Sequence, residues 1–170
     1  MIKKIKKINW LESLPEKYKF NSNDKIELFL NNDKEKIFIN KNRGNGATHY
    51  TVMEMMYYIH TNSNKEIAFV TNTRVSSICA MEDISSILLE LFEDINITTN
   101  KNELYICIKD KNIKIRFIYN PNQAYGLKLN AVYVDNIYYV KKEVLENVIF
   151  ATTFYNESYI VANYTPLFKS

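Results

Sequence analysis

Residues 39–49 read Ile-Asn-Lys-Asn-Arg-Gly-Asn-Gly-Ala-Thr-His and join a short apolar run at 36–40 to an amphipathic stretch at 47–60. The two patterns predict a strand followed by a helix. The chain holds three glycines, and two of them, Gly44 and Gly46, lie in this connection. A chain of average composition would hold about a dozen, so we expect glycine here to mark a backbone conformation that other residues avoid. The segment predicts a tight loop from strand into helix.

A loop in this position predicts a phosphate-binding site. Small residues let successive N–H groups converge, and the helix N-terminus adds partial positive charge. The hydroxyl of Thr48 stands where a Mg²⁺ ligand belongs. The standard pattern G-x-x-x-x-G-K-[ST] is not met, because Lys41 occupies the place of the first glycine and Ala47 that of the lysine. For the loop alone, a glycine turn that caps a helix is the alternative.

Two further apolar runs are predicted to be strands that end in polar residues. The strand at 131–135 ends in Asp135, which matches the second nucleotide-site motif, whose Asp holds Mg²⁺ through water. A helix N-cap is the alternative role for Asp135. The run at 147–153 ends in Thr152 and Thr153, which could sense a γ-phosphate. Because ligands bind at the carboxyl ends of parallel strands, these residues and the loop predict one site.

The rest of the chain alternates strand and helix patterns, which predicts parallel βαβ units. The sequence indicates a single α/β domain over 1–170, a three-layer mostly parallel sheet with an added hairpin and helices on both faces. The further predicted elements are strands at 66–71 and 159–163, helices at 75–93 and 141–147, and a hairpin of 103–108 with 113–119.

Composition excludes some classes of protein and partner. No window of 18 apolar residues exists, so no membrane partner is expected. Cys79 and Cys107 lack metal-type spacing and are predicted to be reduced core thiols, which suits an intracellular protein. The net charge of +3 is too small to indicate nucleic-acid binding by itself. We expect the lysines at 3, 4, 6 and 7 to form a solvated N-terminus rather than phosphate contacts.

In this order the motifs resemble the ATPase domain of terminase large subunits, the viral DNA-packaging motors. Residues 42–48 are similar to that family's arginine-bearing loop, commonly G-R-G-S-G-K-S. Val134-Asp135-Asn136 is similar to its Asp-Glu pair, and Ala151-Thr152-Thr153 to its coupling motif. The resemblance covers roughly residues 10–165. It implies a P-loop NTPase core at 36–165 after an N-terminal segment at 1–20.

The resemblance also implies roles for individual residues. Thr48 and Asp135 would hold Mg²⁺, and Thr152 and Thr153 would couple nucleotide state to movement. Arg43 would act on the charge that develops on the γ-phosphate. The implied ATP-binding residues are Lys41, Arg43, Gly44, Asn45, Gly46, Ala47, Thr48 and His49, and the implied catalytic residues are Arg43, Asn136 and Lys41.

Three departures from the family pattern bear on activity. Ala47 cannot neutralise phosphates, so we predict that Lys41 substitutes, as in terminases that carry the lysine at the loop's first position. A degenerate loop and a deliberate Lys→Ala change are the alternatives. Asn136 replaces the catalytic Glu and can orient water but cannot accept its proton, which predicts slow hydrolysis or none. No nuclease domain is predicted.

The function implied is ATP hydrolysis coupled to packaging of duplex DNA in the host cytoplasm during infection. The partners implied are duplex DNA, further copies of the chain in a ring, and packaging proteins such as a portal or small terminase subunit. One alternative is an inactive relative that acts as a binding or structural module. Another is an initiator or helicase-loader ATPase, against which the predicted hairpin argues.

Overall fold

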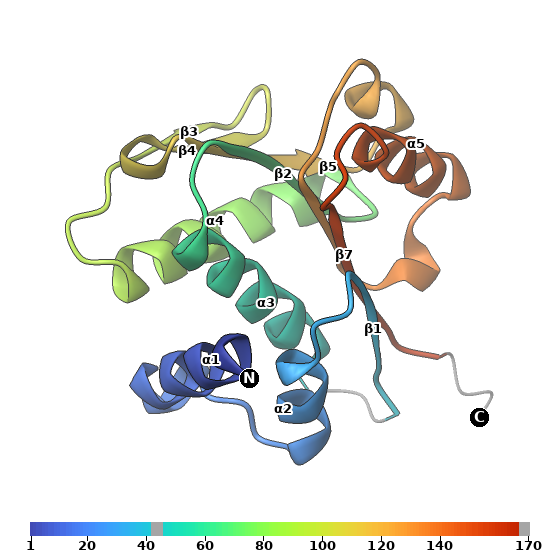
Figure 1. The fold of residues 1–170 in the computed structure, drawn as a ribbon. Coiled ribbons are helices and arrows are strands. Elements are labelled where there is room, and N and C mark those ends of the chain that lie inside the picture. The colour runs from blue at the N-terminus through green and yellow to red at the C-terminus, as the bar shows by residue number, and fades with distance from the viewer. Residues whose placement is uncertain (42–45, 167–170) are drawn as a thin grey trace.

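Seven strands form one sheet in the computed structural model, which describes residues 1–41 and 46–166 (Figure 1). The strands are β1 Glu35–Ile39, β2 Lys65–Val70, β3 Ile97–Asn100, β4 Tyr105–Ile108, β5 Ile113–Ile118, β6 Ala131–Val134 and β7 Tyr159–Tyr164. Their order across the sheet is β1-β7-β6-β2-β5-β4-β3. Neighbours from β1 to β5 pair in parallel, and β4 adds to β5 as an antiparallel hairpin that β3 extends. The mostly parallel sheet with an added hairpin is confirmed.

Helices cover both faces of this sheet. They are α1 Ile2–Ser13, α2 Asn23–Leu30, α3 Ala47–Thr61, α4 Arg74–Leu91 and α5 Lys142–Thr152. In Figure 1, α3 and α4 lie on one face, with α1 and α2 outside α3, and α5 lies on the other face. The predicted three-layer α/β architecture is confirmed.

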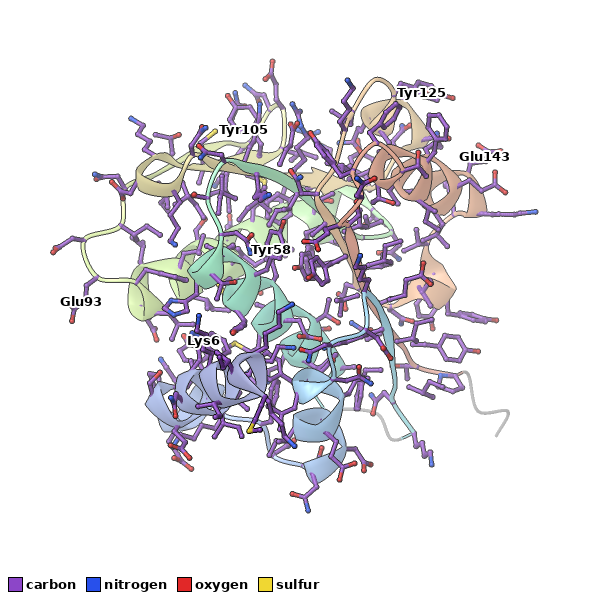
Figure 2. All side chains as sticks on the ribbon, in the orientation of Figure 1. Lys6, Tyr58, Glu93, Tyr105, Tyr125 and Glu143 are labelled. Atoms are coloured by element: carbon purple, nitrogen blue, oxygen red, sulfur yellow. The ribbon has the colours of Figure 1, made fainter. Side chains whose placement is uncertain are left out.

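Strand β6 divides its side chains between two cores because successive residues of a strand point to opposite faces. Ala131 and Tyr133 belong to the core beneath α3, and Val132 and Val134 to the core beneath α5. All four are buried. Figure 2 shows Tyr58 of α3 directed into the space between that helix and the sheet. The same alternation decides which face the residues after β6 approach.

The predicted strand at 147–153 is wrong, because this run continues the helix α5. A strand would place Val148 and Phe150 on one face. Instead Val144, Val148 and Ala151 are buried, with helical spacings of four and three, whereas Phe150 is 64% exposed. Of the apolar side chains in this run, only Val148 and Ala151 belong to the buried stripe of the helix.

The N-terminal segment is more ordered and more buried than predicted. It forms α1 and α2, and Lys7 donates hydrogen bonds to the carbonyl oxygens of Phe29 (2.8 Å) and Asn31 (3.0 Å). Lysines 3, 4 and 6 are exposed as expected. Burial, followed by the charge of Lys36, lowers the pKa of Lys7 to about 8. The prediction that all four lysines are solvated is therefore wrong for Lys7.

A buried ion pair fixes α3 against β1. Lys36 Nζ lies 3.1 Å from Glu54 Oε2, and both side chains are less than a tenth exposed. Tyr50 donates to the same carboxylate oxygen at 2.7 Å, and Lys36 also donates to the carbonyl oxygen of Phe29 at 3.1 Å. Burial raises the pKa of Glu54, and the charge of Lys36 opposes that rise. The network joins α2, β1 and α3 around the start of the predicted loop.

Membrane spans and the two cysteines were also considered from composition. Among residues 1–41 and 46–166, no helix is long and apolar enough to cross a membrane. Cys79 and Cys107 are both free thiols. Their predicted core positions are wrong, however, because Cys79 is exposed and Cys107 is only half-buried.

Candidate functional site

Helix α3 is the next element after β1 and begins at Ala47. Gly46 is its N-cap, with φ +70° and ψ 36°, a left-handed conformation that glycine adopts without strain. The Gly46 carbonyl accepts a hydrogen bond from the Tyr50 N–H at 2.9 Å, which starts the helix. The first N–H groups of a helix have no acceptor within it, so they can bind an anion. The predictions for Arg43, Gly44 and Asn45 lie outside the described residues.

Thr48 and Asp135 meet beside this helix start. Thr48 Oγ1 donates to Asp135 Oδ1 at 2.8 Å, and the Asp135 N–H donates to the Val70 carbonyl at 2.9 Å. The second bond extends the parallel pairing of β6 with β2 by one residue. By the alternation along β6, Asp135 lies on the face of Ala131 and Tyr133, which is the face that α3 covers. The structure thus brings the two predicted Mg²⁺ ligands together.

Asn163, near the carboxyl end of β7, connects the other groups around Asp135. Its Nδ2 donates to Asp135 Oδ1 at 3.0 Å and to Thr51 Oγ1 at 2.8 Å, and its Oδ1 accepts from the Asn136 N–H at 2.9 Å. The side chain is 1% exposed. Sequence reasoning predicted this strand but gave Asn163 no role. The rule applied to Asp135, that a polar residue at a strand's carboxyl end marks a site, would have identified it.

Thr152 and Thr153 lie at the end of α5, on the other face of the sheet from α3. Their hydroxyls donate back to the carbonyl oxygens of Ile149 (2.6 Å) and Phe150 (2.7 Å). Their predicted place at the end of a strand, on which the coupling role rested, is wrong because the run is helical. The strand that does lie between β6 and β1 is β7, and its polar residue is Asn163.

Asn136 follows Asp135 in a left-handed conformation with φ 49°. Asparagine adopts this conformation more readily than most residues. Its Oδ1 is buried and has no hydrogen-bond partner among the described residues. A buried acceptor without a partner is unfavourable, so this oxygen is suited to accept a hydrogen bond from a bound water or ligand. An amide cannot act as a general base there.

The remaining predicted residues differ in their surroundings. Lys41 is exposed, Ala47 is buried in the first turn of α3, and His49 is half-buried with no partner for Nε2 among the described residues. Burial, followed by the charge of Lys25, lowers the pKa of His49. No recorded contact of the described chain joins Lys41 to Thr48 or Asp135.

The donor atoms at this site suit a hard cation. Within the described ranges, no group of three His, Cys, Asp or Glu side chains could hold a metal ion. The hydroxyl of Thr48 and the carboxylate of Asp135 supply oxygen ligands only. Mg²⁺ typically takes one or two protein ligands and fills its shell with waters and phosphate oxygens. The pair fits Mg²⁺ that arrives with a phosphate and does not fit a dedicated protein cage.

The protein is thus a mostly parallel α/β domain. Its polar site lies at the start of α3, where Thr48 meets Asp135 and Asn163. No protein-family model and no curated protein sequence matches the chain. Solved structures match it well, and they place its fold with the ATPase domain of phage large terminases. The predicted resemblance is therefore confirmed at the level of the fold.

Three matches illustrate the likeness. The large terminase of a thermophilic bacteriophage has a TM-score of 0.67 at 10% identity, over 96% of this chain and 38% of that one. The large terminase ATPase domain of Thermus phage P74-26 has a TM-score of 0.68 at 10% identity, over 96% of this chain and 69% of that one. The HK97 bacteriophage large terminase has a TM-score of 0.66 at 14% identity, over 89% of this chain and 33% of that one.

The share of each chain that matches differs between these proteins. This chain spans 38% of the thermophilic-phage large terminase and 33% of the HK97 protein. The thermophilic-phage protein has also been solved in complex with ADP and with ATP-gamma-S, and both of those structures match this chain. The TM-scores of 0.66–0.68 establish a common fold, although the identities are only 10–14%.

Proposed function

We propose that this chain is a nucleotide-binding motor domain of the terminase type, which binds ATP with Mg²⁺ at the start of α3. The observation that carries the proposal is the hydrogen bond between Thr48 and Asp135 beside the N-terminus of that helix. The likeness to large terminases, one of them solved with ADP and with ATP-gamma-S, supports it.

Several groups among the described residues would bind the nucleotide phosphates and Mg²⁺. The backbone N–H groups at the start of α3 would hold phosphate oxygens, because they lack helical acceptors and lie at the positive end of the helix dipole. Thr48 and Asp135 would hold Mg²⁺, which neutralises phosphate charge when bound. Asn163 would keep the Asp135 carboxylate oriented and would connect it to Thr51 of α3 and to the backbone of Asn136.

Hydrolysis is proposed to be slow, because Asn136 stands where the family has a catalytic carboxylate. Its amide could orient a water through the buried Oδ1 but could not take the proton. Glu143 and Glu146 offer no substitute. Both are exposed on α5, and Glu143 projects outward from the face of the sheet opposite α3 (Figure 2).

The finer parts of the proposal follow from the family likeness. They are assembly of several copies in a ring around duplex DNA, contact with portal or small-subunit packaging proteins, and action inside the infected host cell. The second candidate function is an inactive relative that binds nucleotide or partner proteins without turnover. Ala47 and Asn136 favour it, since each removes a charged group on which turnover relies.

Thermal melting with ATP and Mg²⁺ tests the binding proposal. A ligand at 100 times its dissociation constant stabilises a fold by about 2.7 kcal/mol, so the wild-type chain should melt at a higher temperature. Asp135→Ala should lose the shift. Asp83→Ala, at an exposed carboxylate of α4, is the matched control and should keep it. Absence of any shift in the wild-type chain at millimolar ATP would refute the proposal.

Turnover in the presence of duplex DNA distinguishes the two candidate functions. A motor should release phosphate faster when DNA is added, and the rate should fall in Asp135→Ala. An inactive relative should show nucleotide-dependent melting with no phosphate release under either condition. The Asn136→Glu variant should raise the hydrolysis rate if this position meets the attacking water.

A further inference from the structure

Lys25 of α2 places its ammonium group against the N-cap of α3. Its Nζ lies 3.2 Å from the position that a Cβ on Gly46 would occupy. It donates to Asn21 Oδ1 at 2.8 Å and lies 5.6 Å from the centre of the Phe38 ring of β1. The residue is 1% exposed. A lysine from outside the loop is therefore held at the point where the chain enters the helix.

This arrangement concentrates positive charge at one spot. The helix N-terminus carries about half a positive charge, and the Lys25 ammonium lies beside it. Removal from water disfavours a charged group, and burial lowers the pKa of Lys25. The charge already acts on a neighbour, since Lys25 contributes to the lowered pKa of His49. An anion bound at the helix start would stabilise the ammonium and the helix dipole together.

The loop has no lysine at the position where the family carries one, so the phosphate charge that this lysine neutralises needs a cation from elsewhere. Ala47 occupies the family's lysine position, and the substitute predicted from sequence, Lys41, is exposed. A lysine ammonium acts as a point charge on a flexible stem, so it can serve a phosphate from a neighbouring element. Lys25 meets that requirement from α2.

We propose that Lys25 is a nucleotide-binding residue, which supplies from α2 the positive charge that Ala47 cannot supply and contacts the terminal phosphates of the bound nucleotide. This inference rests on the proposed function and adds to it the source of the missing cation.

Calorimetric titration of Lys25→Met and Lys25→Gln with ATP, ADP and adenosine tests the inference. Methionine retains the length of the stem, and glutamine can still donate to Asn21. A hydrogen bond to a charged group supports a loss of about 10- to 100-fold in ATP and ADP affinity. Adenosine affinity should change less than about twofold, since adenosine has no phosphate. Lys4→Met, at an exposed lysine of α1, is the control and should bind ATP like the wild-type chain.

A rescue variant separates a phosphate contact from a purely structural role. Lys25→Met combined with Ala47→Lys should regain most of the lost ATP affinity, because the charge returns at the usual place. If Lys25 only supports the fold, Lys25→Met and Lys25→Gln will each weaken the binding of ATP and of adenosine equally. Addition of Ala47→Lys will then restore no affinity. Equal ATP affinity in Lys25→Met and the wild-type chain overturns the inference alone. Failure of the wild-type chain to bind ATP overturns the proposed function as well.

Discussion

Thr48 and Asp135 are 87 positions apart in the chain, and a hydrogen bond of 2.8 Å joins the threonine hydroxyl to the aspartate Oδ1. Thr48 lies in the first turn of α3, and Asp135 follows β6. Asp135 also accepts from Asn163, so the same carboxylate oxygen receives two donors. A bound divalent cation would compete with both donors for this oxygen. The strength of Mg²⁺ binding should therefore depend on these three side chains.

The Thr48 hydroxyl should make nucleotide binding depend on Mg²⁺. Thr48→Val removes the hydroxyl and nearly keeps the shape of the side chain, and we expect ATP affinity to become insensitive to Mg²⁺. Thr48→Ser retains the hydroxyl and should behave like the wild-type chain. Titration of ATP with Mg²⁺ or with EDTA measures the difference. A Thr48→Val variant that still needs Mg²⁺ would show that the threonine is not a ligand.

Asn163 should contribute more to stability than a peripheral asparagine. Asn163→Ala removes one of the two donors to Asp135 Oδ1 and leaves the Asn136 N–H without its acceptor, which should lower the free energy of unfolding by about 2–3 kcal/mol. Asn147→Ala removes a single half-buried bond to the Pro121 carbonyl (3.2 Å) and should lower it by about 1 kcal/mol. Urea denaturation of both variants checks the difference, and equal losses would contradict it.

Glu54→Gln should destabilise the fold strongly. The substitution keeps the volume but leaves the Lys36 ammonium buried without its counter-charge, which typically lowers stability by about 3–5 kcal/mol. The control is Glu82→Gln, which removes an ion pair with Lys101 whose two side chains are more than half exposed. That change should stay below about 1 kcal/mol. The two denaturation midpoints should differ clearly, and similar midpoints would argue against a tightly buried pair.

Gly46 and Gly126 form a matched pair for substitution. Both are left-handed, with φ +70° and +75°, so alanine at either position should strain the backbone by about 1–2 kcal/mol. A Cβ on Gly126 meets no atom within 4 Å, whereas one on Gly46 approaches Lys25 Nζ to 3.2 Å. Gly46→Ala should therefore be the less stable variant by chemical denaturation. A smaller loss than in Gly126→Ala would contradict the close approach of Lys25.

The pKa of Lys7 predicts a pH-dependent contribution to stability. Because this pKa falls from 10.5 to about 8 on folding, the unfolded chain binds more protons between these values. The unfavourable contribution of Lys7 is fully present below pH 8 and disappears as pH rises toward 10.5. The stability of the wild-type chain relative to Lys7→Met should therefore rise between pH 8 and 10. A constant difference in unfolding free energy across this range would count against the burial of Lys7.

Local patterns in the sequence predicted most of the fold. The strand and the helix around residues 36–60, with Gly46 at the start of the helix, were found because apolar periodicity and rare glycines are properties of neighbouring residues. The hairpin of β4 and β5 was found for the same reason. The first half of helix α5 was predicted at 141–147, but its second half was mistaken for a strand because a short apolar run fits a buried strand or a buried helix. Packing favours the helix, because the helix buries Val144, Val148 and Ala151 together.

The order of amino acids was enough to establish that a glycine precedes a helix, and that an acidic residue follows a buried strand. Which other side chains contact the start of the helix and the acidic residue depended on packing in three dimensions. Asn163 reaches Asp135 because β7 lies between β1 and β6, and Lys25 reaches Gly46 because α2 packs beside the start of α3. Spacing along the chain governs contacts within one element. Contacts between elements depend instead on how the cores beneath α3 and α5 bury their apolar faces.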